Sequence, residues 1–365
     1  MKVAFFLGRL KRGGAESLVC DICKRHDSAP FGICCLYRED DDYSDEFKRS
    51  GAELIQVRRK GNIIGYIWNL RKAVLDHHID IIHAQTPSNA LVSIAALFFT
   101  PVKIVTSFHG FSFSDAPRWY WKTIYKCSKS IICVSKYEKQ YYINKWKLPE
   151  NNKIQVIYNG IDFSKLDCPK PSLTQLISID ENTLNMIMVG SFIKGRSQFF
   201  VCQVLHRLDQ MRVPFNMYFV GRREESEYWR YDDCVSFCEQ NNLTEKVRFL
   251  GNRTDVPYLL SQMDLFLYAS EHDTFGIAVI EAIASGLPVV VNDWAVMKEI
   301  TNDGQWATLY ESNSIDDCVL QLELLIKEES IRKNDAQRIA MVVKEHFSIE
   351  NHINALSKVY EKTIL

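Results

Sequence analysis

The stretch EHDTFGIAVIEAIASGLPVVV (residues 271–291) follows a buried-strand pattern and places two carboxylates around a glycine turn. Asp273 lies in the loop before Gly276, and Glu281 lies within an apolar helix expected to begin near Ile277. Burying a carboxylate in such a helix is costly without a partner, whereas the N–H groups and dipole at the helix N-terminus attract a diphosphate. The pattern predicts a sugar-nucleotide site, with one carboxylate on a ribose and the other on sugar hydroxyls. A structural alternative stays open, in which Asp273 caps the helix and Glu281 forms a buried ion pair.

Short apolar runs alternate with helical patterns along the whole chain, which is typical of βαβ units and parallel sheets. A chain of 365 residues is also long enough for two domains of ordinary size. We therefore expect an α/β protein with two Rossmann-like domains whose parallel sheets face a central cleft. The expected strands are at 2–8, 31–37, 52–58, 79–85, 102–108, 130–135 and 154–160, then at 184–192, 215–221, 246–251, 265–270, 287–293 and 306–311.

A polar stretch with two prolines at 166–183 is the best candidate for a linker. It separates an N-terminal domain at 1–165 from a C-terminal domain at 184–348. The family resemblance described below implies that the first is the acceptor-side domain and the second the nucleotide-sugar-binding domain. The helix expected at 349–365 can cross back to the first domain.

The charge is unevenly distributed although the formal net charge is −1. Residues 1–165 contain 25 Lys and Arg against 16 Asp and Glu, whereas residues 166–365 contain 19 against 29. The basic excess is concentrated at 117–149, where eight Lys and Arg are interleaved with Trp and Tyr. Such a segment suits an anionic membrane surface or a phosphate-bearing acceptor, but it equally suits a solvated helix face whose aromatics turn to the core. Nucleic acid is not expected as a partner, because no binding module is present.

Cysteine usage and hydropathy favour a cytoplasmic protein. The eleven cysteines are scattered and odd in number, as expected in a reducing compartment. No apolar run reaches the ~18 residues of a spanning helix, and the N-terminus lacks a signal-peptide pattern. Cys20 and Cys23 have no second pair at zinc spacing, so we interpret them as buried thiols. The acidic runs at 39–42 and 231–233 are interpreted as solvated charge, and no metal is expected.

The opening stretch resembles the E-x7-E signature of family-4 glycosyltransferases, retaining enzymes of the GT-B fold. The usual form reads roughly E-G-F-G-x-x-x-x-E-A-x-A-x-G-x-P-V-V, and this chain differs in having Asp273 as the first acid. The resemblance implies that Glu281 holds the ribose and that Asp273 touches the donor sugar. It also implies that the backbone amides of Phe275, Gly276 and Ile277 face the sugar and the phosphates.

Four further motifs in the first half are similar to those of the same family and occur in the same order. Gly13 and Gly14 form a G-G-x-E loop, in which glycines let backbone amides approach a diphosphate. DIIHAQ at 80–85 is similar to D-[IV]-[IV]-H-x-H, with Gln in place of the second His. His109, in a His-Gly at a strand end, is implied to lie near the donor sugar. VIYNGID at 156–162 is interpreted as a structural turn.

In the second half, VGSFIKGR at 189–196 is similar to a loop that often reads V-G-R-x-x-x-x-K-G. The resemblance implies that Gly190 and Ser191 approach the phosphates, with Ser191 replacing a clamping Arg. Arg196 aligns best with the family's Lys, and Lys194 is the alternative phosphate ligand. Arg253 belongs to a loop that is implied to contact the nucleobase.

The resemblance implies a retaining glycosyltransferase, of hexosyl or N-acetylhexosaminyl type, that uses a UDP- or GDP-sugar and no metal or cofactor. The implied catalytic residues are His109, Asp273 and Arg196. The implied acceptor is a glycan or a lipid-linked glycan of bacterial surface polysaccharide synthesis, with the enzyme peripheral on the inner face of the membrane through 117–149. The alternatives are a sugar-nucleotide epimerase on the same fold and a non-catalytic sugar-nucleotide-binding subunit.

Overall fold

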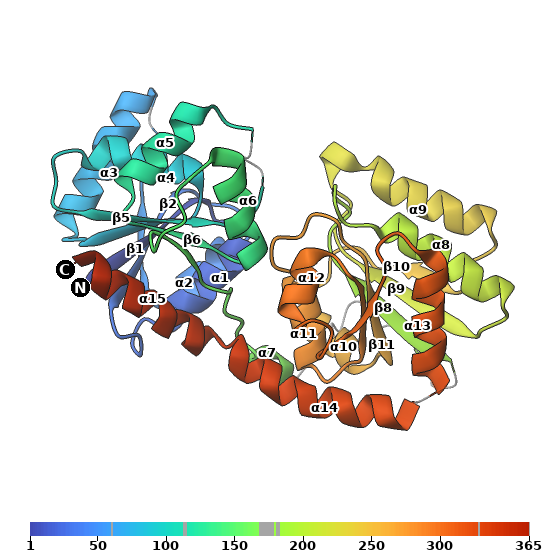
Figure 1. The fold of residues 1–365 in the computed structure, drawn as a ribbon. Coiled ribbons are helices and arrows are strands. Elements are labelled where there is room, and N and C mark those ends of the chain that lie inside the picture. The colour runs from blue at the N-terminus through green and yellow to red at the C-terminus, as the bar shows by residue number, and fades with distance from the viewer. Residues whose placement is uncertain (60, 112–114, 168–178, 180–182, 328, 365) are drawn as a thin grey trace. The chain divides into compact units, whose positions relative to one another are not determined.

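The computed structural model describes the chain except residues 60, 112–114, 168–178, 180–182, 328 and 365 (Figure 1). It divides into two compact units, Met1–Asp162 with Phe347–Leu365, and Phe163–His346. The predicted linker at 166–183 falls largely outside the described residues. Among the described residues, no helix has the length and apolar character needed to cross a membrane.

Unit 1 is a seven-stranded parallel sheet with helices on both faces. Its strand order, β3-β2-β1-β4-β5-β6-β7, reverses direction between β1 and β4. Helices α3, α4 and α5 cover one face of the sheet, and α1 and α15 cover the other (Figure 1). The strands are β1 (Lys2–Arg9), β2 (Gly32–Glu39), β3 (Glu53–Gln56), β4 (Ile81–Ala84), β5 (Lys103–Phe108), β6 (Ser130–Cys133) and β7 (Ile154–Val156). The helices are α1 (Gly14–Cys23), α2 (Ser44–Arg49), α3 (Ile63–Asp76), α4 (Pro87–Leu97), α5 (Arg118–Cys127), α6 (Lys136–Trp146) and α15 (Ile349–Ile364).

The apolar runs of the sequence form strands because a parallel sheet is buried on both faces. In β1 the residues Val3 to Phe6 are all completely buried. Alternate residues of β1 join separate core clusters on the two faces of the sheet, so that Phe5 packs on one side and Phe6 on the other. Cys20 and Cys23 are buried free thiols in α1, as predicted.

The C-terminal helix α15 packs into unit 1, although it follows the whole of unit 2 in the sequence. Its apolar side chains belong to the same core cluster as those of β1 and α1. The turn before unit 2 fits closely against it, because a Cβ at Gly160 would lie 2.6 Å from the Cβ of His352. This contact explains why β7 ends at Val156 and not near residue 160 as predicted.

Unit 2 is a six-stranded parallel sheet of order β10-β9-β8-β11-β12-β13, which reverses direction between β8 and β11. The predicted α/β class with two Rossmann-like domains is therefore confirmed. The strands are β8 (Leu184–Val189), β9 (Phe215–Val220), β10 (Val247–Phe249), β11 (Leu265–Tyr268), β12 (Val289–Asn292) and β13 (Thr308–Tyr310). The helices are α7 (Ser164–Asp167), α8 (Gln198–Gln210), the 3-10 helix η1 (Glu225–Glu227), α9 (Trp229–Gln240), α10 (Val256–Ser261), α11 (Ile277–Ala284), α12 (Ala295–Ile300), α13 (Ile315–Lys327) and α14 (Glu329–His346).

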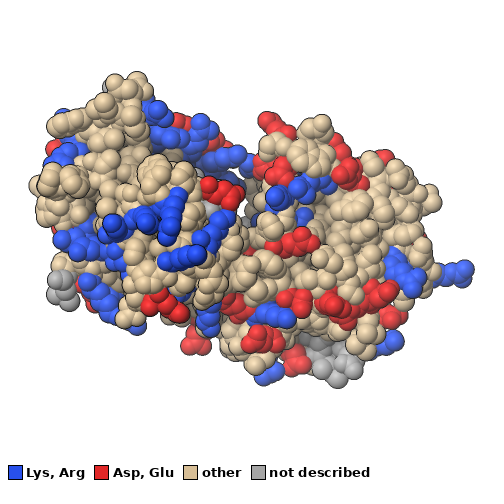
Figure 2. Space-filling model, turned by 45° about the horizontal axis from the view of Figure 1, so that its top comes forward, with Lys and Arg blue, Asp and Glu red and all other residues tan. Residues whose placement is uncertain are grey.

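The basic aromatic segment 117–149 forms α5, β6 and α6 of unit 1. Its Trp121 and Tyr142 are buried with the sheet, whereas Trp119 is 63% exposed. Figure 2 shows groups of Lys and Arg side chains on the surface of unit 1. Most of the aromatic rings thus turn to the core, and the cations face solvent with one exposed tryptophan among them.

Candidate functional site

The candidate site of unit 2 lies where the direction of the strand order reverses. Strands β8 and β11 are neighbours. The strand that follows β8 in the sequence adds to one edge of this pair, and the strand that follows β11 adds to the other. In open α/β sheets, ligands bind at the carboxyl ends of the strands at such a point. The loops that follow β8 and β11 contain the predicted residues at 190–196 and 273–277.

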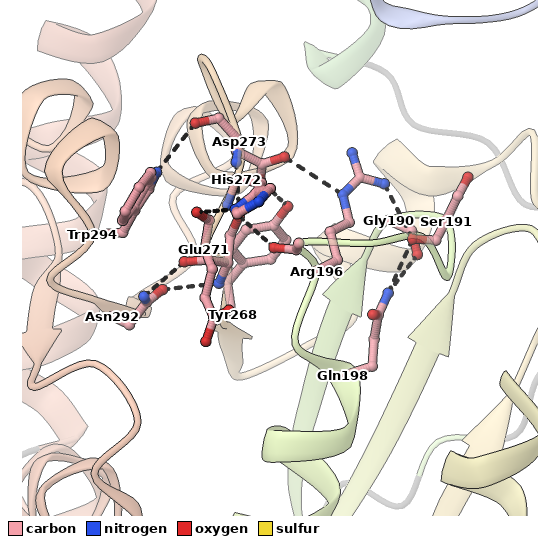
Figure 3. Close-up of polar contacts among 12 residues, drawn as sticks. Gly190, Ser191, Arg196, Gln198, Tyr268, Glu271, His272, Asp273, Asn292 and Trp294 are labelled. Atoms are coloured by element: carbon pink, nitrogen blue, oxygen red, sulfur yellow. Dashed lines mark hydrogen bonds and ion pairs between the residues drawn. The ribbon is translucent and has the colours of Figure 1, made fainter. Parts of the chain in front are cut away.

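The loop after β11 is fixed by side chains from neighbouring strands (Figure 3). Asn292, the last residue of β12, accepts a hydrogen bond from the backbone N–H of Ser270 and donates one to its carbonyl. The Ser270 hydroxyl accepts the N–H of Asp273 at 3.1 Å. The indole of Trp294 donates to the Asp273 carbonyl at 3.2 Å. The backbone that carries Asp273 is therefore held from both sides.

Helix α11 begins at Ile277, as the sequence predicted. Gly276 precedes it with φ 84°, a left-handed conformation that favours glycine. A Cβ there would lie 2.9 Å from the Met297 side chain. The helix N-terminus thus emerges at the reversal point, where its N–H groups and dipole favour an anion. Glu281 lies in the second turn of this helix and is half-buried.

Arg196 connects the two loops of the site (Figure 3). Its Nε lies 3.7 Å from Oδ1 of Asp273, and its guanidinium lies 3.4 Å from the Ser191 carbonyl. Both separations are long for hydrogen bonds, so the guanidinium can turn its donors to an incoming phosphate. The Tyr268 hydroxyl donates to the other oxygen of Asp273 at 2.5 Å. The two predicted catalytic residues of this unit, Arg196 and Asp273, are thus brought together.

The pKa values of Arg196 and Tyr268 are both raised in this cluster. Burial acts to lower the pKa of Arg196, but Tyr268 and Asp273 outweigh it and the pKa is raised. Burial, with the nearby Asp273 carboxylate, raises the pKa of Tyr268. The phenol therefore stays protonated and serves as a hydrogen-bond donor to the carboxylate.

The loop after β8 approaches its neighbours closely. Gln198 donates to the carbonyls of Gly190 and Ser191. A Cβ at Gly221 would lie 2.0 Å from the Gly190 carbonyl oxygen, so only glycine fits there. Sequence reasoning missed Gly221, which ends the neighbouring strand β9. Because Gly221 has no side chain, the backbone at Gly190 can pack directly against it.

The two alternative phosphate ligands of this loop differ in their surroundings. Lys194 is exposed, and its backbone N–H is bound by the Glu227 carboxylate. Arg196 is half-buried and faces Asp273. A cavity of about 490 Å³ has both side chains and His272 in its lining.

Arg253 occupies the loop after β10, an edge strand of the sheet. Its guanidinium is buried and makes two hydrogen bonds, of 2.8 and 2.7 Å, to the Asp255 carboxylate. This pair holds the side chain in the loop itself. The nucleobase contact that the resemblance implies for the backbone of this loop stays a prediction.

In unit 1 the predicted residues also lie at the reversal point of the sheet. Gly13 and Gly14 follow β1, and His109 follows β5, with β4 between the two strands. Gly13 is the N-cap of α1, and a Cβ there would lie 2.6 Å from the Glu16 carboxylate. The G-G-x-E motif therefore packs its own acid over the glycine.

His109 is held by Gln85, a contact that the sequence did not predict. Its Nε2 lies 2.9 Å from Oε1 of Gln85, the residue that replaces the second His of the family motif. Gln85 donates its amide to the His83 carbonyl, so its oxygen faces His109 and accepts from Nε2–H. The adjacent Gly110 is fixed by α6, whose Tyr142 hydroxyl donates to the Gly110 carbonyl at 2.7 Å.

Three buried histidines near this point are neutral at physiological pH. Burial lowers the pKa of His83 well below its usual value, and it lowers those of His109 and His352 to about 4. His83 is bound by the Tyr360 hydroxyl at 2.6 Å and by the Ser107 hydroxyl at 2.7 Å.

These histidines predict that the protein loses stability as the pH falls from about 6.5 toward 4. In that window the three histidines His83, His109 and His352 bind protons in the unfolded chain but not in the folded protein. Each of them can therefore lower the free energy of unfolding by up to about 1.4 kcal/mol per pH unit. The raised pKa values of Glu16 and Glu138 act in the opposite direction and offset part of this loss. Urea unfolding at pH 7.5 and 5.5 should give the lower free energy of unfolding at pH 5.5. His352→Gln should reduce the difference, and equal stability at both pH values would refute this prediction.

Two family models match consecutive parts of the chain. The model for "Glycosyltransferase Family 4" matches residues 12–165, and that for "Glycosyl transferases group 1" matches residues 172–340. The first contains Gly13 and His109, and the second contains Arg196, Asp273 and Glu281. Together the two matches leave only short terminal segments and a few residues between them.

Characterised relatives are distant but cover most of the chain. An *Escherichia coli* protein named UDP-Gal:alpha-D-GlcNAc-diphosphoundecaprenol alpha-1,3-galactosyltransferase is 22% identical over 80% of this chain and 78% of its own length. The O-antigen biosynthesis glycosyltransferase WclY of *Escherichia coli* is 22% identical, with 82% of each chain covered. N-acetyl-alpha-D-glucosaminyl L-malate synthase of *Bacillus anthracis* is 26% identical over 58% of this chain and 54% of its own length.

Solved structures resemble the chain over its whole length. A glycosyltransferase from *Rickettsia africae* has a TM-score of 0.85 at 18% identity, covering 100% of this chain and 98% of its own. *Anabaena* HepE, solved with UDP and glucose, has a TM-score of 0.83 at 18% identity, covering 99% of this chain and 100% of its own. These likenesses confirm the predicted GT-B fold class.

Proposed function

Because the chain belongs to the group 1 glycosyltransferases of family 4, we propose that it is a retaining enzyme using a UDP- or GDP-sugar. It transfers a sugar from a nucleotide sugar and is related to enzymes of O-antigen and polysaccharide synthesis. The observation that carries the proposal is the pairing of Arg196 with Asp273 beside the N-terminus of α11, with Glu281 one turn further along. The transferred group in this proposal is a hexosyl or N-acetylhexosaminyl unit.

The diphosphate would lie against the N-terminus of α11, with Arg196 neutralising the negative charge that grows on the leaving phosphate. Glu281 would accept hydrogen bonds from the ribose, and Asp273 would contact the donor sugar. Front-face attack then needs no side-chain nucleophile, since positioning and electrostatic stabilisation supply most of the rate. Arg196 and the helix amides provide the positive charge that a metal would otherwise supply, so we expect activity to survive EDTA.

Unit 1 would bind the acceptor in this proposal. The neutral ring of His109 is oriented by Gln85, which supports a role close to the reacting hydroxyls. A glycan or lipid-linked glycan of a bacterial surface polysaccharide is the acceptor class suggested by the relatives' names.

The experiment is a transfer assay with labelled UDP- and GDP-sugars, in the presence and absence of EDTA, using bacterial lipid-linked glycans as acceptors. The proposal expects label in the acceptor from one donor and an anomeric configuration equal to that of the donor. A product whose anomeric configuration is inverted relative to the donor would reject the retaining mechanism. Tight nucleotide binding without any turnover would support a non-catalytic binding subunit instead.

We also propose that the protein is cytoplasmic and attaches to an anionic membrane surface through 117–149. The exposed lysines of α5 and α6 and the 63% exposed Trp119 support this attachment. Co-sedimentation with phosphatidylglycerol vesicles should be strong at low salt and should weaken in Trp119→Ala. Binding that is independent of lipid charge and salt would remove the membrane proposal.

A further inference from the structure

A cavity of about 630 Å³ lies at the open edge of the unit 1 sheet. Its lining includes Ser130 and Ile154, the first residues of β6 and β7. The cavity extends from these amino ends along the open edge of β7 to Val156, its last residue. His109 and the glycine loop follow β5 and β1 and are not in its lining.

Three lysines from different parts of unit 1 line this cavity. Lys129 precedes β6, Lys139 is on α6 and Lys362 is on the last turn of α15. No carboxylate is among the described residues that line it. Three ammonium groups around one cavity repel one another, so the site favours an anion with more than one negative charge.

The sheet edge adds backbone donors to the cavity. On either side of β7, the Lys153 carbonyl accepts a hydrogen bond from the Ile131 N–H, and the Ile157 N–H donates to the Cys133 carbonyl. Odd-numbered residues of this segment therefore bond to β6. Because β7 is the last strand and successive residues face opposite sides, the N–H groups of Ile154 and Val156 point to the open edge. Both residues line the cavity.

The remaining lining is suited to an organic phosphate. The side chains of Ile154, Val156 and Val359 give the cavity an apolar wall, whereas Asn151, Asn152 and Thr363 are polar. Asn151 already bonds to the Tyr125 hydroxyl and the Lys153 N–H, and the Thr363 hydroxyl donates to the Val359 carbonyl. Lysines recognise phosphate as point charges, and backbone N–H groups supply directed hydrogen bonds. The volume lies within the range of small-molecule sites, about 300–1,000 Å³.

We propose that this cavity is a second anion site, which binds a phosphate or diphosphate ester through Lys129, Lys139, Lys362 and the free edge of β7. The ester is supplied either by a soluble phosphorylated metabolite or by the headgroup of an anionic lipid. The site is separate from the donor site and does not depend on the glycosyltransferase reaction.

The test is calorimetric titration with pyrophosphate of full-length protein carrying Arg196→Ala, which weakens the donor site. Lys129→Gln/Lys139→Gln/Lys362→Gln should weaken the remaining binding at least tenfold. The matched control Lys48→Gln/Lys72→Gln/Lys327→Gln removes the same charge from three exposed lysines and should change the affinity less than twofold. Equal effects of the two triple variants would overturn the proposal.

A second measurement needs no change to the lysines. Hydrogen exchange of the peptide containing residues 150–160 should slow when pyrophosphate is added to the Arg196→Ala protein, because the edge amides of Ile154 and Val156 become protected. Unchanged exchange at saturating pyrophosphate would also overturn the proposal.

Vesicles distinguish the two sources of the ester. If a lipid headgroup is the ligand, pyrophosphate should release the protein from phosphatidylglycerol vesicles, and the cavity triple variant should bind them more weakly than the control triple variant. If a soluble metabolite is the ligand, pyrophosphate binding should depend on the three lysines, but pyrophosphate should not release the protein from the vesicles. The release by pyrophosphate decides between the two sources, because Lys129 and Lys139 also belong to 117–149 and their loss alone can weaken vesicle binding.

Discussion

Arg196→Ala is expected to lower kcat/KM for the donor by about 10²–10³, the cost of losing one preorganised group that stabilises the leaving charge. Arg196 is the half-buried cation that lies between the Gly190–Ser191 loop and Asp273. The family's second clamping cation is replaced by Ser191, so no arginine at that position compensates. Steady-state kinetics of nucleoside diphosphate release measure this effect.

Lys194→Ala is the matched control, because it removes a cation from the same loop. Lys194 is exposed, so we expect its loss to change kcat/KM less than fivefold, as for a solvent-screened charge. If Lys194→Ala is the more damaging change, the phosphate clamp has been assigned to the wrong residue. Arg196→Lys should recover only part of the activity, because a lysine cannot reproduce the planar guanidinium fork.

Asp273→Ala is expected to lower kcat/KM by about 10², since it removes a sugar contact and the carboxylate that faces Arg196. The Tyr268 hydroxyl donates to the other carboxylate oxygen of Asp273 at 2.5 Å, so Tyr268→Phe should have a smaller effect in the same direction. If Tyr268 acts only by positioning Asp273, Tyr268→Phe should have no further effect in the Asp273→Ala background. Equal effects of Tyr268→Phe in both backgrounds would show that the tyrosine acts independently.

Much of the fold could be predicted because the apolar runs and the glycine turns are local signals. Each strand within the described residues overlaps a predicted run, since strands buried on both faces are continuously apolar. The start of α11 at Ile277 could be predicted from Gly276. This glycine adopts a left-handed conformation directly before the helix. The predicted length of β7 was wrong, because its end depends on α15, which is almost 200 residues further along the chain.

The partners of the site residues could not be predicted, because they depend on which strands become neighbours. Gln85 meets His109 only because β4 and β5 pair. Gly221 meets Gly190 only because β9 lies beside β8. Alternation of strands and helices predicts a parallel sheet but not its strand order, so these contacts carry no local signal in the sequence.

The most direct test of the account is a thermal shift of wild type and Glu281→Gln with UDP, GDP and ADP. A nucleotide present at 100 times its dissociation constant should stabilise the wild-type protein by about 2.7 kcal/mol. The account predicts that one nucleotide does so and that Glu281→Gln loses most of this stabilisation. Glu271 is an exposed carboxylate at the same end of the sheet, so the control variant Glu271→Gln should keep the stabilisation. A response that Glu281→Gln retains in full, or the absence of any response in wild type, would contradict the assignment of the donor site.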